Sequence, residues 1–449
     1  MTEKESNSSQ ISGEMVEKFH FECIDCKAEY PGDKIIYLCP ACDRNNQPGV
    51  PPRGVLKTIY KYAWIRSLQS AEKLFQSLKE DHFLPLLPIS DTRYWPNLRI
   101  GNTPLYRIDH RLWLEKNDLD FGLYLKDDSQ NPTFSLKDRA SALVSAWAGE
   151  NTIGTLITAS TGNAGSSLAG ICAARGQRAI IVVPAAAPLA KLTQILMYGA
   201  ILIPVKGTYD DAFDLSVKLT QKYSWYNRNT AYNPLTIEGK KTVSFELFMQ
   251  LGHKVPDRIF IPVGDGVIFS GVCKGFEDLL KLGIIDRMPV VVAVQAQGSK
   301  NLINNLDRES FISSASRTIA DSISVDVPRC YHMTANYIKE YDGEYISVSD
   351  QEILQASQQL ARSTGIFCEP AAAAAFAGML KYRRGGLILP GSINVVLLTG
   401  SGLKDLSAVQ TTIKIPEPVG ADILSVERLM DDYPDILTDI KDKQTKNQH

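Results

Sequence analysis

Lys137 is the side chain of this sequence best placed to act as a nucleophile or a base. Asn131-Pro132 interrupts the chain before it, since a residue that precedes proline avoids the α region. Apolar residues then recur at helical spacing, so we expect a helix with Ser135 as N-cap and Asp138 in an approximate capping box. Burial and the helix dipole would both lower the pKa of a lysine in the first turn. Such a lysine can form an imine with an aldehyde; an ordinary surface lysine is the alternative.

The turn Ser160-Thr161-Gly162-Asn163-Ala164-Gly165 is a second feature with chemical potential. It follows the apolar run 155–159, which we expect to be a strand, and it opens the helical stretch 165–174. Backbone N–H groups at the start of a helix bind anions, and glycines let a ligand approach the backbone closely. A plain strand-to-helix turn is the alternative.

Four cysteines near the N-terminus have the spacing of metal ligands, namely Cys23, Cys26, Cys39 and Cys42. Two Cys-x2-Cys pairs on short strands around the turn 31–33 predict a zinc ribbon. Four thiolates would close a tetrahedral site, so the zinc would be structural. A redox pair or unmetallated thiols are the alternatives. The other cysteines are scattered, which is typical of a reduced cytoplasmic protein: Cys172, Cys273, Cys330 and Cys368.

Composition narrows the class of protein. The chain has 449 residues, of which 44% are hydrophobic and 22% charged, and this balance is typical of a globular protein with a large core. A net charge of -2 gives no sign of nucleic-acid binding. No apolar run has transmembrane length, and the polar first residues lack a signal-peptide core. We therefore expect a cytoplasmic protein that contacts neither nucleic acid nor membrane.

Strands and helices alternate from residue 150 onward, after a linker and an amphipathic helix expected over 65–79. The expected strands are 155–159, 179–183, 201–205, 258–263, 289–295 and 394–399. The expected helices are 165–175, 187–198, 209–223, 240–251, 269–282, 350–363 and 371–382. Continuous apolar strands separated by helices indicate parallel sheets covered on both faces. Ligands bind such folds at the carboxyl ends of strands, where the turns 160–165, 264–268 and 399–402 are expected.

Six short blocks occur in a recognisable order between residues 98 and 406. They are Gly101-Asn-Thr-Pro-Leu105, Ser135-Leu-Lys-Asp-Arg139, Ser160-Thr-Gly-Asn163, Ile261-Pro-Val-Gly-Asp-Gly266, Glu369-Pro-Ala-Ala-Ala-Ala and Leu398-Thr-Gly-Ser-Gly-Leu-Lys-Asp405. In this order they resemble the fold-type II pyridoxal-phosphate (PLP) enzymes, and most closely the threonine synthase branch. Relatives in that branch often carry an N-terminal zinc ribbon.

The resemblance implies an α/β fold similar to the tryptophan synthase β subunit. Two doubly wound parallel-sheet domains would follow an N-terminal zinc-ribbon extension. The implied segments are a disordered tail (1–17), the ribbon (18–50), a helical linker or cover (51–97), a large PLP domain (98–137 and 257–420), a small domain (138–256), and a C-terminal helix and tail (421–449).

The resemblance also implies roles for individual residues. Lys137 would hold PLP as an imine and later carry protons at Cα, and Asn163 would hydrogen-bond the O3′ of the cofactor. Thr399 would face the pyridine nitrogen, and a hydroxyl there favours elimination and replacement over transamination. The substrate carboxylate would lie on Ser160, Thr161 and Gly162. The cofactor phosphate would lie in the loop made by Gly264, Asp265, Gly266, Val267 and Ile268.

The sequence departs from threonine synthases at the residues thought to grip the substrate phosphate. Ala231 stands in place of a serine, Thr236 in place of an arginine and Asp265 in place of an asparagine. Losing the arginine removes a bidentate clamp, and Asp265 adds repulsion to a nearby phosphate. Lys240 replaces a glutamine and would supply a relocated cation for the substrate.

Three changes at one subsite indicate a substrate other than O-phosphohomoserine. The cysteate synthase offshoot of the family, which replaces the phosphate of O-phospho-L-serine with sulfite through an aminoacrylate, fits these changes. The alternatives are threonine synthase itself, a serine or threonine dehydratase-type lyase, and a non-catalytic PLP-binding paralogue. The family resemblance implies a homodimer and a small amino-acid substrate.

Overall fold

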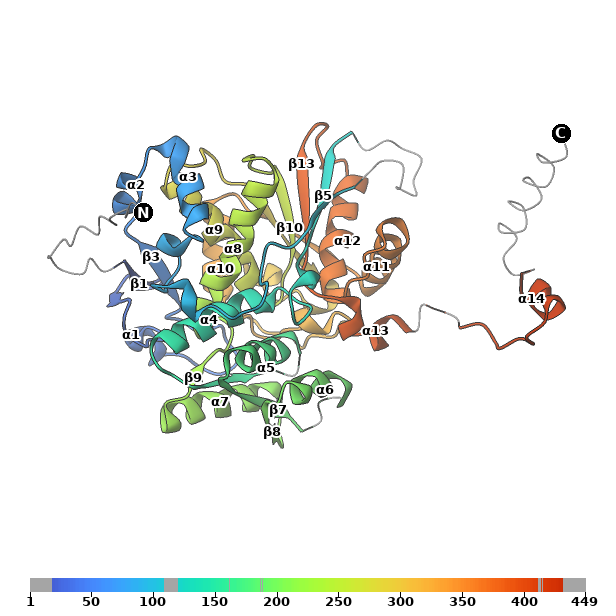
Figure 1. Ribbon diagram of the computed structural model, residues 1–449, viewed down its shortest axis with the longest axis horizontal. Coiled ribbons are helices and arrows are strands. Elements are labelled where there is room, and N and C mark those ends of the chain that lie inside the picture. The colour runs from blue at the N-terminus through green and yellow to red at the C-terminus, as the bar shows by residue number, and fades with distance from the viewer. Residues whose placement is uncertain are drawn as a thin grey trace, which may run out of the picture. The chain divides into compact units, whose positions relative to one another are not determined.

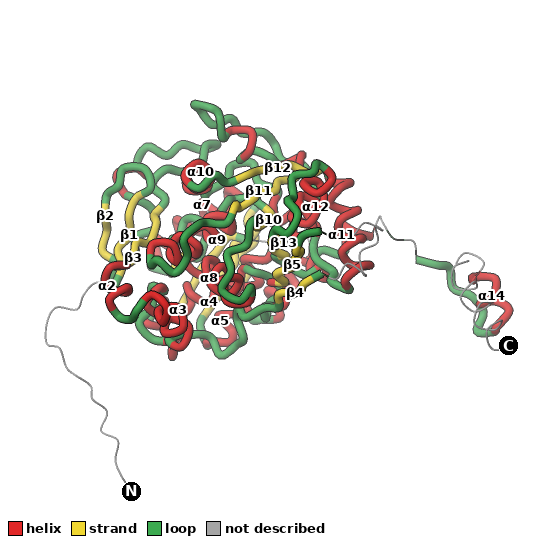
Figure 2. The backbone as a smooth tube through the Cα atoms, turned by 90° about the horizontal axis from the view of Figure 1, so that it is seen from above, coloured by secondary structure: helices red, strands yellow, loops and turns green. Residues whose placement is uncertain are grey.

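Two largely parallel β-sheets carry most of the chain in the computed structural model. The structure describes residues 18–108, 120–160, 162–185, 187, 189–410, 413 and 415–430. The six-stranded sheet has the strand order β12-β11-β10-β13-β5-β4, which Figure 2 shows across its centre. Its strands are β4 (Leu105–Arg107), β5 (Gly122–Asp127), β10 (Arg258–Pro262), β11 (Val290–Ala296), β12 (Glu344–Val348) and β13 (Ile393–Leu398). Only the pair β4–β5 is antiparallel.

The four-stranded sheet is parallel throughout, with the order β8-β7-β6-β9. Its strands are β6 (Thr155–Ala159), β7 (Arg178–Pro184), β8 (Ile201–Val205) and β9 (Tyr226–Asn227). The main helices are α4 (Lys137–Glu150), α5 (Asn163–Arg175), α6 (Leu189–Met197), α7 (Tyr209–Tyr223), α8 (Leu235–Gln250), α9 (Val267–Lys281), α10 (Tyr331–Glu340), α11 (Asp350–Thr364), α12 (Pro370–Arg384) and α13 (Ser407–Gln410).

Both faces of the larger sheet are covered, and β13 shows why. Successive side chains of a strand point to opposite faces. Val395 and Leu397 belong to the apolar cluster that contains Phe276 of α9, whereas Val396 and Leu398 belong to the cluster that contains the alanines of α12. All four side chains are fully buried. The predicted α/β class with covered parallel sheets is confirmed.

The predicted elements match the observed ones with a few exceptions. All six expected strands are present, but β4, β5, β9 and β12 were not predicted, and neither was α10. The single helix expected over 65–79 is wrong, because the chain forms two helices there, α2 (Tyr62–Ser67) and α3 (Ala71–Glu80). The predicted domain boundaries stay predictions.

The cysteine-rich segment forms an antiparallel sheet of β1 (Phe19–Cys23), β2 (Glu29–Pro31) and β3 (Leu56–Tyr60). We predicted that the second cysteine pair also lies on a strand, and this prediction is wrong. Cys39 instead precedes the short helix α1 (Pro40–Asp43), where a proline suits the first helical position.

Residues 409–449 form a unit that is separate from the one made by residues 1–408. Its described part contains the helix α14 (Ile423–Met430), on which Ile423 and Leu424 are exposed. None of the helices within the described ranges has the length and hydropathy needed to cross a membrane.

The N-terminal sheet is joined to α8 and α9 by hydrogen bonds between buried and half-buried groups, and Figure 1 shows β1 and β3 beside these helices. The Tyr60 hydroxyl donates to Glu238 at 2.5 Å, and the Lys57 ammonium donates to Glu277 at 2.7 Å. Glu238 also accepts from Lys241 of the same helix, whose ammonium lies 4.1 Å from the centre of the Tyr60 ring. Because a buried carboxylate needs donors, these bonds fix the sheet against α8.

We expect the substitution Tyr60→Phe to lower the free energy of unfolding by about 1.5–3 kcal/mol, because Glu238 loses a donor inside the protein. Urea unfolding followed by tryptophan fluorescence measures this change. Tyr345→Phe removes a hydroxyl from a side chain that is 41% exposed and serves as the control, for which we expect no change. Equal stabilities of the two variants would contradict this account of the interface.

Candidate functional site

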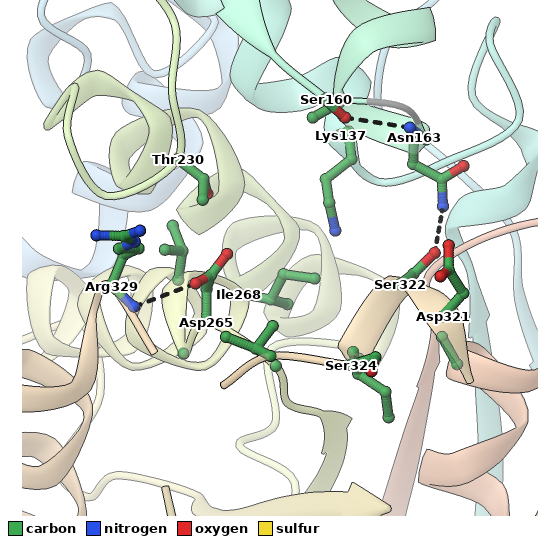
Figure 3. Close-up of a pocket in the computed structure, with 18 of the residues that line it drawn as sticks. Lys137, Ser160, Asn163, Thr230, Asp265, Ile268, Asp321, Ser322, Ser324 and Arg329 are labelled. Carbon is green, nitrogen blue, oxygen red and sulfur yellow. Dashed lines mark hydrogen bonds between the residues drawn. The ribbon is translucent and has the colours of Figure 1, made fainter. Parts of the chain in front are cut away.

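A cavity of about 500 Å³ lies at the carboxyl ends of strands from both parallel sheets. It is lined by residues that follow β6, β10 and β13, by the first turn of α7 and by the loop 321–329. Figure 3 shows this cavity with Lys137 pointing into it. The sequence argument that ligands bind at strand ends therefore leads to one place in the structure.

Most of the residues predicted to form the site line this single cavity. They are Lys137, Ser160, Gly162, Asn163, Lys240, Gly264, Asp265, Gly266, Val267, Ile268 and Thr399. Thr161 lies outside the described residues. Four segments far apart in the sequence, around 137, 160, 265 and 399, are thus brought together.

Lys137 is the first residue of α4, and its position depends on β13. The Leu136 N–H donates to the Thr399 carbonyl at 2.9 Å, and the Ser401 N–H donates to the Phe134 carbonyl at 3.1 Å. The predicted Ser135 cap is wrong: Leu136 is the N-cap residue and makes no side-chain cap bond. The Asp138 carboxylate instead accepts from the Thr133 N–H and hydroxyl, because the chain before the helix folds back over it.

The Lys137 ammonium lies in an environment that disfavours its charge. Burial is the main cause of a lowered pKa, and the nearby Arg228 lowers it further, whereas Glu369 and Asp265 act in the opposite direction. The predicted lowering of the lysine pKa agrees with this direction. An amine with a lowered pKa is a better nucleophile and base near neutral pH.

The loop between β10 and α9 has the backbone geometry of a turn that could bind an anion. The first hydrogen bond inside α9 runs from the Ser270 N–H to the Gly266 carbonyl, so the N–H groups of Val267, Ile268 and Phe269 precede the helical ladder. Gly266 has φ +87°, and a Cβ there would lie 2.2 Å from the Thr334 hydroxyl. Only glycine fits this turn, which offers its N–H groups to a phosphate or carboxylate.

Glu369 is a residue of the cavity that sequence reasoning did not assign to the site. Its side chain accepts from the Asn163 amide at 2.9 and 3.0 Å, and burial raises the pKa of its carboxyl. A Cβ at Gly400 would lie 2.6 Å from this carboxylate, so the glycine makes room for it. Glu369 directly precedes the proline that begins α12, and this position was the sequence signal that could have indicated its role.

Arg329 and Asp265 form a second polar group at the cavity. The Arg329 N–H donates to the Asp265 carboxylate at 3.1 Å, and the Arg329 guanidinium pairs with Asp210 of α7. Burial raises the pKa of Asp265, while the bond from the Arg329 N–H and the cations Arg329, Lys240 and Lys137 lower it. The ion pair between Arg329 and Asp210 joins the two sheet layers at the edge of the cavity. No sequence motif pointed to Arg329.

Ala231 and Thr236 are the two other positions at which the sequence departs from threonine synthases. Neither is among the residues that line the cavity. Thr236 is buried and its hydroxyl donates to the Asn233 carbonyl at 2.7 Å. Ala231 is also buried and has φ +60°, in the left-handed region. Lys240, on the same helix as Thr236, does line the cavity, and its ammonium donates to the Thr230 hydroxyl at 3.3 Å.

The four N-terminal cysteines form a compact cluster of their own. The sulfur atoms of Cys23, Cys26, Cys39 and Cys42 all lie within 4.8 Å of one another. No disulfide joins them, and the Tyr30 hydroxyl lies 3.0 Å from the Cys39 sulfur. Four converging sulfur atoms suit a tetrahedral ion such as zinc.

Comparisons with known proteins identify the family to which this chain is similar. The profile of the family described as "Pyridoxal-phosphate dependent enzyme" matches residues 97–400. A threonine synthase of Methanocaldococcus jannaschii is 35% identical over 418 residues, which is 91% of this chain and 98% of the relative. One from Methanosarcina acetivorans is 35% identical over 413 residues, or 90% and 97% of the two chains.

A solved structure shows the same fold at lower identity. The processed form of threonine deaminase isoform 2 from Solanum lycopersicum superposes with a TM-score of 0.60 at 21% identity. The match covers 77% of this chain and 95% of that one. Together with the family match and the two relatives, this places the chain among the pyridoxal-phosphate-dependent enzymes, and it belongs to the threonine synthase family.

Proposed function

We propose that this enzyme catalyses β-replacement on O-phospho-L-serine, with sulfite as the nucleophile and L-cysteate and phosphate as products. The observation that carries the proposal is the composition of the cavity. It places Lys240 and Asp265 beside Lys137, while Ala231 and Thr236 do not line it. This set of charges differs from the phosphate clamp that the family resemblance implies, which supports a different substrate.

The residues of the cavity fit PLP. The N–H groups before the α9 ladder suit the cofactor phosphate, the buried Thr399 hydroxyl suits the ring nitrogen, and Lys137 supplies the amine for the aldehyde. The Asn163 amide, which donates to Glu369 in this structure, would donate to the ring oxygen when the cofactor is bound. Bound PLP would supply the electron sink that the reaction at Cα needs.

Lys137 would move the proton at Cα of the substrate. Its lowered pKa lets the amine accept that proton near neutral pH and return it once the new bond has formed. The Leu136–Thr399 bond holds the lysine at the end of β13. General acid–base catalysis of this kind contributes about 10²–10⁴-fold to the rate.

Ser160 and Gly162 would bind the substrate carboxylate at the start of α5. The Gly162 N–H already donates to the Ser160 hydroxyl at 3.2 Å, which orients that hydroxyl. Helix N-termini stabilise carboxylates through free N–H groups and the dipole. The side chain of the substrate would then extend into the cavity, which Lys240 also lines.

Threonine synthase activity is the second candidate, and the two relatives at 35% identity favour it. That reaction starts from a substrate one methylene longer, with the same phosphate leaving group. The two candidates therefore differ in the distance at which the phosphate must be held. A homodimer remains an expectation from the family.

We expect the PLP-loaded enzyme to release phosphate from O-phospho-L-serine in the presence of sulfite. Its kcat/KM should exceed that for O-phospho-L-homoserine by at least about tenfold, since one methylene in a fitted pocket is worth that much. A coupled phosphate assay measures both. Phosphate release from O-phospho-L-homoserine alone would establish the second candidate instead. Sulfite-independent release with formation of a 2-oxo acid would identify a lyase.

The lowered pKa of Lys137 predicts a pH dependence for cofactor uptake by PLP-free protein. The protonated amine is no nucleophile, so uptake is slow below the lysine pKa and levels off above it. We expect this plateau well below pH 10.4, the ordinary pKa of lysine, because burial lowers the pKa of Lys137. Stopped-flow absorbance measures the rate, with free Nα-acetyllysine as the reference. Identical profiles for protein and reference would contradict the lowered pKa, and Lys137→Ala should lose the step altogether.

We further propose that the cysteine cluster holds one structural zinc ion. Its four thiolates would occupy every coordination position, so no chemistry is expected there. The ion would fix β1, which carries Cys23, to the segment around α1, and it would complete a small sheet whose other side contacts α8.

Metal analysis of the purified protein should find about one zinc per chain. Cys42→Ser removes one ligand, and we expect it to lose the zinc and to unfold the N-terminal sheet at lower temperature. Cys172→Ala changes a buried thiol in α5, outside the cluster, and should keep the metal. Zinc retained by Cys42→Ser at the wild-type affinity would refute the four-cysteine site.

A further inference from the structure

The N-terminal sheet is connected to both parallel sheets, and Tyr37 contacts the smaller one. Lys57 of β3 donates to Glu277 of α9, a helix that covers one face of the larger sheet. The Tyr37 hydroxyl accepts from the Asn227 N–H of β9, in the smaller sheet, at 2.9 Å. The Tyr37 ring also stacks on Tyr232, with 4.6 Å between the ring centres and 14° between the planes.

Backbone bonds fix the segment that carries Tyr37 to the start of β3. Leu38 forms an antiparallel bridge with Val55, which directly precedes β3. The Cys39 N–H donates to the Gly54 carbonyl at 2.8 Å. Tyr37 is therefore the neighbour of a paired segment, and its position follows that of the N-terminal sheet.

The Asn227 N–H needs an acceptor from outside its own sheet. β9 lies at the edge of the smaller sheet and pairs with β6. The Arg228 N–H donates to the Ile157 carbonyl of β6 at 2.8 Å. Because successive N–H groups of a strand point in opposite directions, the Asn227 N–H points away from β6. Asn227 is fully buried, where an N–H without an acceptor is costly, and the Tyr37 hydroxyl supplies that acceptor.

Asn227 in turn organises the loop 229–233. Its backbone carbonyl accepts from the Asn233 side-chain amide at 2.7 Å, and its own side-chain oxygen accepts from the Asn229 N–H at 2.7 Å. The Asn233 N–H donates to the Asn229 carbonyl at 3.1 Å. Both ends of this loop are thus bonded to the residue that Tyr37 holds.

Thr230 carries this arrangement to the cavity. Its side chain lines the cavity, and Figure 3 shows Thr230 and Asn163 on opposite sides of Lys137. The Thr230 carbonyl accepts from the N–H of Tyr232, the residue on which Tyr37 stacks. A shift of the Tyr37 side chain would therefore reach the cavity through two routes, one by hydrogen bonds and one by ring packing.

We propose that Tyr37 is a positioning residue for the substrate, which fixes the wall of the cavity that contains Thr230. Tyr37 is not among the described residues that line the cavity, so it acts through Asn227 and the loop. The inference rests on the proposed function for the statement that an amino-acid substrate occupies the cavity. The N-terminal sheet then controls how well the cavity fits the side chain of that substrate, in addition to carrying the four cysteines.

The first test is amide exchange in PLP-loaded protein without substrate. Tyr37→Phe removes the acceptor but keeps the ring that stacks on Tyr232. We expect the amides of Asn227, Tyr232 and Asn233 to exchange with deuterium about tenfold faster, the effect of a lost hydrogen bond to a buried donor. Mass spectrometry with single-residue fragmentation measures the rates. Tyr345→Phe removes an exposed hydroxyl from β12 and should leave all three rates unchanged.

The second test is the kinetics of the same variant. We expect Tyr37→Phe to raise the KM about 3–10-fold for whichever of O-phospho-L-serine and O-phospho-L-homoserine is turned over, with kcat within about twofold of the wild type. The reason is that Tyr37 acts on the wall with Thr230 and not on Lys137. For the same reason the absorbance of bound PLP should stay unchanged. A purely structural role would lower the melting temperature and leave KM as it is.

Two results would overturn the proposal. Faster exchange at Asn227 alone would show that Tyr37 covers the edge of β9 without fixing the loop. An unchanged KM beside faster exchange at Asn233 would show that the loop does not position the substrate.

A second variant decides if Tyr37→Phe does not fold. Tyr232→Leu removes the stacked partner from the loop and should also speed exchange at Asn233 and raise KM; no change in either would refute the positioning role. Faster exchange in a protein that turns over neither phospho-amino acid would refute the proposed reaction but support the effect of Tyr37 on the loop.

Discussion

The paired backbone bonds between residues 134–136 and 399–401 are the constraint on which the site depends. They join two stretches that are more than half the chain apart in sequence, and they set Lys137 at the end of β13. The same turn holds Gly400 against Glu369, and Glu369 in turn holds Asn163 of α5. A short set of backbone contacts thus aligns groups from both parallel sheets around one cavity.

Buried charges are arranged differently in the supporting structure and in the site. Around Glu246 and Asp278, opposite charges meet in the interior and satisfy one another, which fixes the helices α4, α8 and α9. At the cavity, the charges of Lys137 and Glu369 shift each other's pKa without forming an ion pair, and Lys240 contacts a hydroxyl. The first arrangement resists change, whereas the second leaves room for a charged ligand to complete it.

The sequence predicted the fold class and most of the cavity lining, because both depend on local patterns. Apolar runs marked the buried strands, and the turns 160–165, 264–268 and 399–402 follow β6, β10 and β13 as expected. Long-range contacts were not predictable. The Ser135 cap failed because Thr133 and β13 satisfy the start of α4, and β5 was missed because its apolar run, residues 123–125, is too short to mark a buried strand.

The site residues that could not be predicted from the sequence have one property in common. Arg228, Arg329 and Glu369 each follow or precede an ordinary element, and only the folded chain shows what surrounds them. Arg228 is fully buried and its Nη1 has no hydrogen-bond partner among the described residues, which one sequence alone does not record. The proline that follows Glu369 was a local signal, but its partner Asn163 is about two hundred residues away in the sequence.

Consecutive lysines on α8 face different surroundings: Lys240 lines the cavity, and Lys241 bonds to Glu238 and Asp278 beneath the N-terminal sheet. A helix turns by about 100° per residue, so a single inserted or deleted residue upstream would move both lysines by one position around the helix. One ammonium would then lose its carboxylates while the other left the cavity. The length of the chain between Pro234 and Lys240 is therefore constrained by the folded structure, in addition to the identity of individual side chains such as Glu238.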